Sequence, residues 1–168
     1  MYIIEDILIT TDFSDYSSAA VEYAKTFALL YNARIHVLYV AEDSRHLHAS
    51  DQVMKRGERG ISDPEEAMRN FVAQHLPDTR EVHAVVRKGK PYEEIVRYAR
   101  EEGIDLTVIA THGRTGLRHI VIGSVAEKVV RHSSVPVFTV KPKEISDHLI
   151  TQEDIEMNLH LQSMEYVA

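Results

Sequence analysis

The sequence predicts an α/β fold in which helices cover both faces of an open five-stranded parallel sheet. Two observations lead to this prediction. Short apolar runs alternate along the chain with longer segments whose apolar residues recur at helical spacing. The helix-like segments are also bounded by residues that start and stop helices, such as proline in the first turn and glycine after the last. Five strands separated by four helices are the pattern of repeated βαβ units, whose strands lie parallel.

A strand, a helix and a second strand come first. DILIT (6–10) is short and apolar, which is typical of a buried strand. Ser14 or Asp15 can cap the helix that follows, and Asn32 ends it. The apolar residues of this helix step by four and three, at Tyr16, Ala20, Tyr23, Phe27 and Leu30. RIHVLYV (34–40) is then predicted as the second strand.

A polar segment separates the second strand from the second helix. Residues 42–60 contain two glycines and are expected to form a loop with at most one helical turn. Ser62 or Asp63, followed by Pro64, is a typical helix start, because proline is favoured in the first turn. This helix is expected to end near Leu76.

The second half of the sheet domain repeats the pattern. REVHAVVRKG (80–89) is a predicted strand, and PYEEIVRYAREEG (91–103) a helix with proline and acids at its start and glycine at its end. DLTVIA (105–110) is nearly all apolar, which indicates a strand buried on both faces. A helix over about 124–133 and the strand VPVFTV (135–140) complete the series.

Length, charge and composition restrict the function. The 168 residues suit one domain, and a net charge of −7 argues against nucleic-acid binding, which usually needs a basic surface. Cysteine is absent, which excludes disulfides and cysteine nucleophiles and suits a reducing compartment. Acids interrupt the apolar run near the N-terminus and no stretch is long enough to span a membrane, so a cytoplasmic protein without membrane or nucleic-acid partners is expected.

A glycine-rich stretch between the fourth strand and the last helix is the main functional candidate. THGRTGLRHIVIGS (111–124) carries three glycines, two arginines and two histidines. In open parallel sheets, ligands bind beyond the carboxyl ends of strands. TTDFSD (10–15) follows the first strand in the same way, so the two loops converge if the first and fourth strands are neighbours.

The stretch has the chemistry of an anion site. Gly123-Ser124 opens a helix, whose unpaired N–H groups and positive dipole end attract phosphate. Gly113 and Gly116 let the main chain approach an anion closely, and Arg114 adds positive charge if it points inward. No lysine precedes Ser124, and the glycines give GxxG, so neither the Walker motif nor the dinucleotide fingerprint is present.

Several candidates have a structural alternative. Asp12 could hold a ribose hydroxyl or Mg²⁺, or could be a turn residue after a strand. Ser124 could bind phosphate, cap its helix, or do both. His46 and His48 are too few ligands for a metal site, and His112 has no serine–acid partners at a recognisable spacing for catalysis.

In combination these motifs resemble the universal stress protein family over residues 3–142. The matching segments are TDFS (11–14), HVLYV (36–40), THGRTGL (111–117), the helix run 123–133 and VPVFTVK (135–141). Ligand-binding members carry the pattern G-x2-G-x9-G-[ST]. Gly113 and Gly123-Ser124 match its last parts, whereas Ala110 replaces its first glycine and Thr10 stands where many members have proline. A methyl group at 110 fits if the backbone there stays in the β region.

The resemblance implies a Rossmann-like sheet (adenine nucleotide alpha hydrolase-like) of order 3-2-1-4-5, dimers through the fifth strand and, in one subclass, ATP binding. The implied cofactor is ATP or AMP, with Mg²⁺ as an option at Asp12. The positions carried over to adenine and ribose are Thr10, Thr11, Asp12 and Val40. Those carried over to ribose and phosphates are Ile109, Ala110, Gly113, Gly123, Ser124 and Val125, to which Arg114 is added for its charge.

Three functions remain open at this point. A dimeric stress-response module could hold ATP or AMP and change shape or partner affinity, with at most slow hydrolysis. The alternatives are a dimeric interaction protein without nucleotide, which Ala110 favours, and a slow ATP hydrolase that uses Asp12. No lysine on the phosphates and no base for water are recognisable, so fast turnover is not expected.

The chain is expected to divide into a universal stress protein domain (1–142) and a C-terminal extension (143–168). Within the extension, IEMNLHL (155–161) alternates apolar and polar residues, as strands do. It is expected either to be disordered or to add a strand to its own sheet edge or to a partner chain. The strand 135–140, apolar and last in the sheet, is expected to pair with itself in a homodimer.

Overall fold

The computed structural model describes residues 3–42, 61–79, 81–113 and 122–143. Within these residues the five strands and four helices expected from the sequence are present in the expected order. The elements are β1 (Asp6–Thr11), α1 (Asp15–Tyr31), β2 (Arg34–Glu42), α3 (Pro64–His75), β3 (Val82–Gly89), α4 (Pro91–Glu101), β4 (Leu106–Ala110), α5 (Ser124–His132) and β5 (Val137–Val140).

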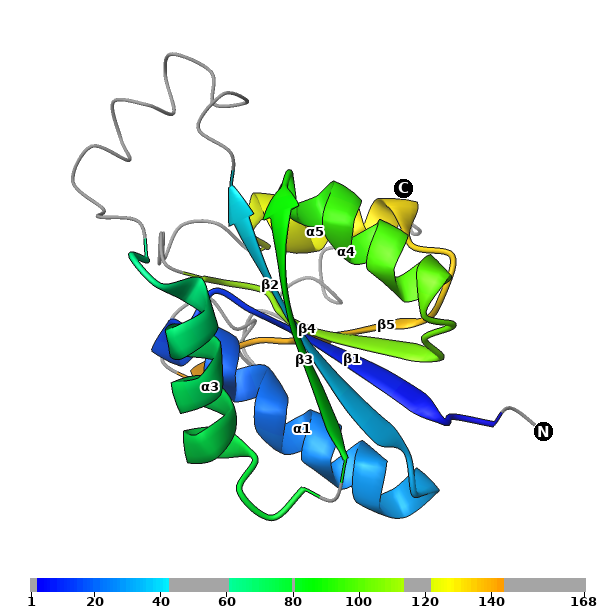
Figure 1. Cartoon of the computed structure of the whole chain (residues 1–168). Helices are drawn as coiled ribbons and strands as arrows, with labels where there is room; N and C mark the ends of the chain where they lie inside the picture. Colours follow the sequence, from blue (N-terminus) through cyan, green and yellow to red (C-terminus); the bar gives the residue numbers. More distant parts are fainter. Residues whose placement is uncertain (1–2, 43–60, 80, 114–121, 144–168) are drawn as a thin grey trace, which may run out of the picture.

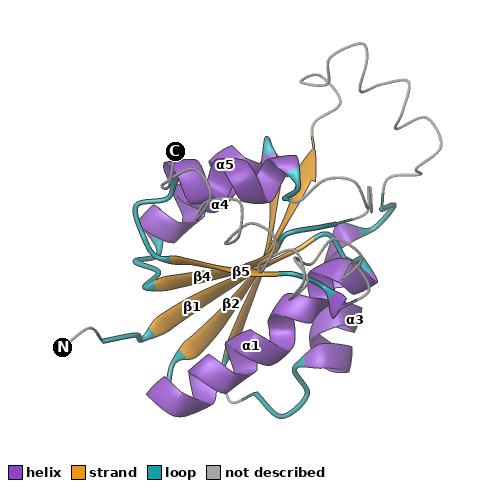
Figure 2. Ribbon diagram, turned by 180° about the vertical axis from the view of Figure 1, so that it is seen from behind, coloured by secondary structure: helices purple, strands orange, loops and turns teal. Residues whose placement is uncertain are grey.

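The strands form one parallel sheet of order β3-β2-β1-β4-β5, which confirms the predicted topology. Helices α1 and α3 cover one face of the sheet, and α4 and α5 cover the other (Figures 1 and 2). β1 lies at the centre, where Leu8 pairs with His36 of β2 and Thr107 of β4. Because both of its faces are covered, all six residues of β1 are buried.

Two hydrophobic cores therefore lie on opposite sides of the sheet. Ile7 and Ile9 of β1 pack on the α1 and α3 side, and Leu8 between them packs on the α4 and α5 side. Successive side chains of a strand point to opposite faces, so a strand buried on both sides must be apolar at nearly every position. This is the physical reason for the continuous apolar runs in the sequence.

The helix ends resolve the alternatives left open by the sequence. Ser14, and not Asp15, caps α1: its side chain accepts a hydrogen bond from the Ser17 N–H at 3.2 Å. Asp63 caps α3 by accepting from the Glu66 N–H at 2.8 Å. Asn32 ends α1 in the left-handed conformation, with φ of 55°.

The apolar stripe that helical spacing indicated in α1 is only partly buried. Of the predicted stripe, Tyr23 is 46% exposed and Leu30 is 70% exposed. The residues that face the sheet are instead the small ones, Ser17, Ala20, Val21 and Ala24. Small side chains let the helix approach the strands closely, which turns the larger residues toward the β5 side of the molecule, where Tyr23 and Phe27 contact Phe138.

Each of the five strands differs from its predicted bounds by one or two residues at one end. β2 continues to Glu42, because β3 pairs with it as far as Glu42 and Gly89. β5 begins at Val137 and not at Val135, since its pairing with β4 starts there. The rest of the predicted 42–60 loop and the alternating segment 155–161 lie outside the described residues. No described helix combines the length and the apolar character that crossing a bilayer requires.

Candidate functional site

The loops that follow β1 and β4 meet at the carboxyl ends of these two strands. The strands are neighbours, with Ile7 paired to Leu106 and Ile9 to Val108, so their ends lie side by side. Gly113 packs directly on Asp12, and a methyl group at position 113 would overlap the Asp12 carboxylate. The convergence predicted from the sequence is confirmed at these two residues.

The two described ends of the glycine-rich stretch also touch. The Gly123 N–H donates to the Thr111 carbonyl at 2.6 Å. A Cβ atom at 123 would lie 2.9 Å from the same oxygen, which is closer than real Cβ contacts allow. Gly123 is therefore required by the approach of one backbone segment to another. Arg114 and Gly116, between these ends, lie outside the described residues.

The turn after β1 is held by a local network of hydroxyl and carboxylate groups. The Asp12 Oδ1 atom accepts hydrogen bonds from the N–H of Ser14 at 3.0 Å and from its Oγ at 2.6 Å. Thr11 Oγ1 accepts from the Phe13 N–H at 2.9 Å and lies 3.0 Å from the Ser17 Oγ. Asp12 is therefore a turn residue, and any ligand role comes in addition.

Sequence reasoning did not single out Phe13 and Ser17, which help to shape this turn. Phe13 takes a left-handed φ of 62°, and its ring packs against Tyr39 with centroids 4.6 Å apart. Ser14 and Ser17 complete the hydrogen bonds around Asp12 and Thr11. An aspartate followed two residues later by serine is the signature of an Asx-turn, and this signal could have identified the motif.

Four further candidates lie together on the α4 and α5 side of the sheet. Val40 and Ile109 belong to the core cluster on that side, and Thr10, one residue beyond Ile9, points the same way. Val125 of α5 packs against the same cluster. These side chains are at most partly accessible, with Val40 9% and Ile109 4% exposed, so they form the floor under the site.

Ala110 lies on the opposite side of the sheet. Its methyl group belongs to the core beneath α1, and the residue pairs with Val140 as part of β4. It is absent from the described residues with positive φ. A methyl group at 110 is therefore compatible with this backbone, and the position does not need glycine.

One of the two roles expected for Ser124, capping α5, is not observed. Gly123 is the N-cap and Ser124 is the first helical residue, with no side-chain capping hydrogen bond, so the interpretation of Ser124 as a cap was wrong. Within the described residues, the amides of Ser124, Val125 and Ala126 donate no hydrogen bond. First-turn amides without an intrahelical partner and the positive end of the helix dipole give this position a preference for anions.

A second polar cluster lies at the opposite, amino end of the sheet. Asp6 accepts from Arg34 at 2.7 and 2.6 Å, and its Oδ1 atom lies 3.1 Å from the His36 Nε2. The His36 Nδ1 lies 2.8 Å from the Tyr98 hydroxyl. Because a carboxylate only accepts, a neutral His36 carries its proton on Nε2 and accepts the Tyr98 proton on Nδ1.

The pKa values of this cluster follow from burial and pairing. Burial alone raises the pKa of Asp6, but the hydrogen bonds from Arg34 and His36 outweigh it and hold the pKa below its ordinary value. Burial lowers the pKa of His36, against the opposing effect of Asp6, so we treat His36 as neutral near pH 7. Burial raises the pKa of Tyr98 to about 12. Nowhere in the described part of the chain do three His, Asp or Glu side chains group as metal ligands would.

Comparison with known proteins agrees with the geometry. The model of the universal stress protein family matches residues 4–141. Universal stress protein MJ0577 of Methanocaldococcus jannaschii is 30% identical over 154 residues, which cover 82% of this chain and 94% of the relative. The solved structure of MJ0577 superposes with a TM-score of 0.69 at 29% identity, covering 84% of this chain and 98% of that one.

Two less similar structures contain adenine nucleotides. A universal stress protein in complex with cAMP matches with a TM-score of 0.62 at 24% identity, covering 82% of this chain and 97% of that one. A universal stress protein from Archaeoglobus fulgidus in complex with dAMP matches with a TM-score of 0.57 at 19% identity, covering 84% of this chain and all of the other. At these identities the likeness concerns the fold.

Proposed function

Because the chain belongs to the universal stress protein family, we propose that it binds an adenine nucleotide, ATP or AMP, where the loops after β1 and β4 meet. The observation that carries the proposal is the contact of Gly113 with Asp12, together with that of Gly123 with Thr111. Gly113 brings main chain close to a carboxylate, and Gly123 brings main chain close to main chain. Both contacts lie beside the first turn of α5. This is the place where open parallel sheets bind ligands.

The parts of the nucleotide are assigned by chemistry. The phosphates would accept hydrogen bonds from the amides of Ser124, Val125 and Ala126, helped by the dipole of α5. The sugar hydroxyls or a Mg²⁺ ion would face Asp12, the carboxylate at this junction that packs on Gly113. The adenine would lie over Thr10, Val40 and Ile109. That two proteins of the same fold hold cAMP and dAMP supports this class of ligand.

The biological role that we propose is regulation and not turnover. No lysine stands at the start of α5, so the phosphates lack the cation that P-loop enzymes use, and hydrolysis should be slow at most. The bound nucleotide would change the shape of the protein or its affinity for a partner. A chain without cysteine suits the cytoplasm, which is the location that we propose.

Titration calorimetry with ATP, ATP plus Mg²⁺, AMP and GTP tests the binding. We expect heat with the adenine nucleotides and a rise in melting temperature, since a ligand at 100 times its Kd stabilises the folded state by about 2.7 kcal/mol. Absence of both effects at millimolar ATP and AMP would reject the proposal. The ratio of absorbance at 260 and 280 nm of the purified protein reports nucleotide that has been carried through purification.

A matched pair of variants locates the phosphates. Ser124→Glu places a carboxylate in the first turn of α5, which favours the helix but repels phosphate, so binding should fall at least tenfold without loss of stability. Val130→Glu adds the same charge at a 50% exposed position further along the same helix and should leave the affinity unchanged. An equal loss of affinity in both variants would place the nucleotide elsewhere.

We also propose that the chain forms a homodimer through β5. This strand is at the edge of the sheet beside β4, and its Phe138 is 36% exposed. The Phe138 ring contacts Tyr23 and Phe27 of α1, with centroids 5.6 and 5.1 Å apart. The Phe138 ring and the 46% exposed Tyr23 therefore leave apolar surface along an open strand edge.

Light scattering of Phe138→Glu tests this interface. We expect a dimer mass for the natural chain, a monomer mass for Phe138→Glu and a dimer mass for the control Val130→Glu. A monomeric natural chain at micromolar concentration would reject the dimer without affecting the nucleotide proposal.

A further inference from the structure

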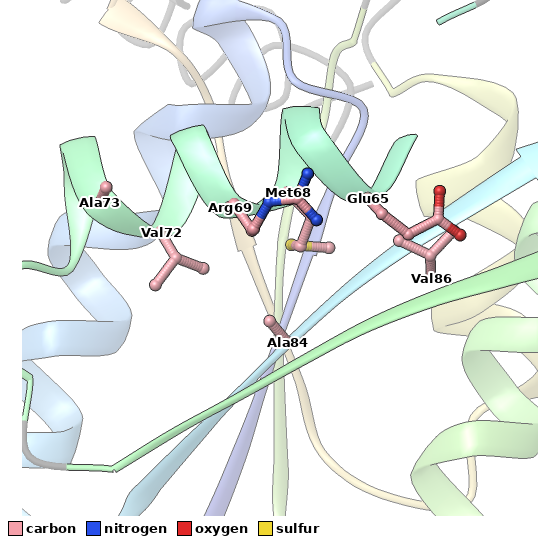
Figure 3. Close-up of a pocket in the computed structure, with 7 residues that line it drawn as sticks. All are labelled: Glu65, Met68, Arg69, Val72, Ala73, Ala84 and Val86. Atoms are coloured by element: carbon pink, nitrogen blue, oxygen red, sulfur yellow. The ribbon is translucent and has the colours of Figure 1, made fainter. Parts of the chain in front are cut away.

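The other edge of the sheet carries a groove between α3 and β3. Figure 3 shows Met68 and Val72 projecting from α3 toward β3, which carries Ala84 and Val86 beneath them. The groove has a volume of about 520 Å³ and is lined by Glu65, Met68, Arg69, Val72, Ala73, Ala84 and Val86. Its walls are mainly apolar, and its charged side chains, Glu65 and Arg69, both come from α3.

β3 is an open edge as well as a wall of this groove. It pairs with β2 over all eight of its residues, and no described residue pairs with its outer side. Its side chains alternate: Val82 and Val86 pack on the α3 side, whereas Val85 packs on the α4 side. An added strand would find backbone partners along the edge and, at every second position, an apolar pocket under α3.

The chain itself contains a segment with the matching pattern. Residues 144–168 follow the last described residue, and IEMNLHL (155–161) lies among them. Four apolar residues occur at two-residue spacing, at Ile155, Met157, Leu159 and Leu161. Four residues of β3 face the α3 side with the same spacing, at Val82, Ala84, Val86 and Lys88.

The length of the chain allows this segment to reach β3. Lys143 lies just beyond the carboxyl end of β5, and α3, which lines the groove, begins at the same end of the sheet. Crossing from β5 to a position outside β3 covers five strand spacings, about 24 Å. The residues between 143 and 155 can span about 36 Å when extended. A segment that arrives from this end runs antiparallel to β3.

We propose that residues 155–161 add to β3 of their own chain as an antiparallel sixth strand and bury their apolar side chains in the groove between α3 and β3. Pairing Met157 with Val86 and Leu159 with Ala84 aligns all four apolar residues with the α3 side. The same register sets Glu156 opposite Arg87 on the other face, where the Arg87 guanidinium also pairs with Glu101 at 2.8 Å and with Glu94 at 3.7 Å. The proposal does not depend on nucleotide binding or on the β5 dimer.

Hydrogen exchange of two full-length variants tests the docking. Met157→Lys with Leu159→Lys places charges in the apolar groove, and the outward amides of β3 should then exchange about tenfold faster. Asn158→Lys with His160→Lys adds the same charges to the other face of the strand and should leave β3 protected. Unchanged exchange in β3 for the first variant, or faster exchange in β5 instead, would overturn the proposal.

Disulfide formation tests the register and the source of the strand. The natural chain has no cysteine, so His83→Cys with His160→Cys introduces the only thiols. We expect these to cross-link within one chain upon oxidation, whereas the control pair His83→Cys with Leu159→Cys, on opposite faces, should not. Cross-linked dimers would assign the strand to a second copy, and equal cross-linking of both pairs would mean no ordered strand; either result overturns the proposal.

Discussion

The two ends of the sheet hold a carboxylate in different ways. At the amino end, Asp6 is fastened by side chains from neighbouring elements, with Arg34 and His36 bonded to it and Tyr98 bonded to His36. At the carboxyl end, Asp12 is held by the turn that follows it, through Ser14, and packs on a glycine. The carboxylate at the amino end is therefore held by long side chains, whereas the carboxylate at the carboxyl end lies against the main chain of its own turn and of Gly113.

This difference indicates that the amino end of the sheet contributes to stability and the carboxyl end to ligand binding. Side chains that satisfy each other in a buried cluster rigidify the fold, but they leave no groups for a ligand. Glycines and a helix N-terminus add little stability, yet they bring backbone N–H groups to a surface where an anion can reach them. The comparison predicts that substitutions at the amino end change stability and that those at the carboxyl end change binding.

The largest effect is expected from Asp6→Ala. It leaves Arg34 and His36 without their common acceptor in a site where Asp6 is 6% exposed, and should lower the free energy of unfolding by about 3 kcal/mol. Urea denaturation measures this loss. Glu22→Ala breaks an exposed pair with Lys25 and should cost about 0.5 kcal/mol or less. Similar losses of stability for Asp6→Ala and Glu22→Ala would mean that the buried cluster stabilises the fold no more than an exposed ion pair does.

Gly123→Ala should come next, because its Cβ atom would press on the Thr111 carbonyl and not on a movable side chain. We expect a loss of about 2 kcal/mol in urea denaturation, as for an overpacked site. Gly113→Ala needs only a shift of the Asp12 side chain, so it should destabilise less while weakening adenine nucleotide binding. A larger loss of stability for Gly113→Ala than for Gly123→Ala would contradict the assignment of these contacts.

The pH dependence should follow from His36. The pKa of His36 is lowered from 6.5 in the folded state. As the pH falls below 6.5, His36 therefore becomes protonated in the unfolded chain before it does so in the folded chain. Stability should therefore fall as the pH drops from 7.5 to 5.5. His36→Gln should flatten this part of the profile, and urea titrations at both pH values measure it. An identical slope in the variant would exclude His36 as the cause.

The smallest effect on stability is expected from Asp12→Asn. The amide oxygen can still accept from Ser14, so the free energy of unfolding should change by less than about 0.5 kcal/mol. The charge is lost, however, and the affinity for nucleotide or its dependence on Mg²⁺ should change in calorimetry. If the variant binds nucleotide as tightly as the natural chain does, both with and without Mg²⁺, Asp12 acts only in the turn.

By itself, the sequence determined the succession of elements and the loop that carries the glycines. Short apolar runs such as LTVIA are typical of strands with two covered faces, and proline before Glu65 or after Lys90 marks a helix start. These signals are local, because they depend on side-chain periodicity and on the φ preference of single residues. The neighbourhood of the β1 and β4 loops followed only from the strand order, which the family resemblance implied and no local signal gives.

Only the tertiary structure decided which surfaces meet. It turned Tyr23 and Leu30 of α1 outward, because Ser17 and Ala24 allow closer packing on the strands. It also joined Asp6 to residues 28 and 30 positions away and placed Gly113 on Asp12. Such contacts depend on how closely two elements approach and at what rotation, which is set by the packing of all their side chains together and not by any one segment.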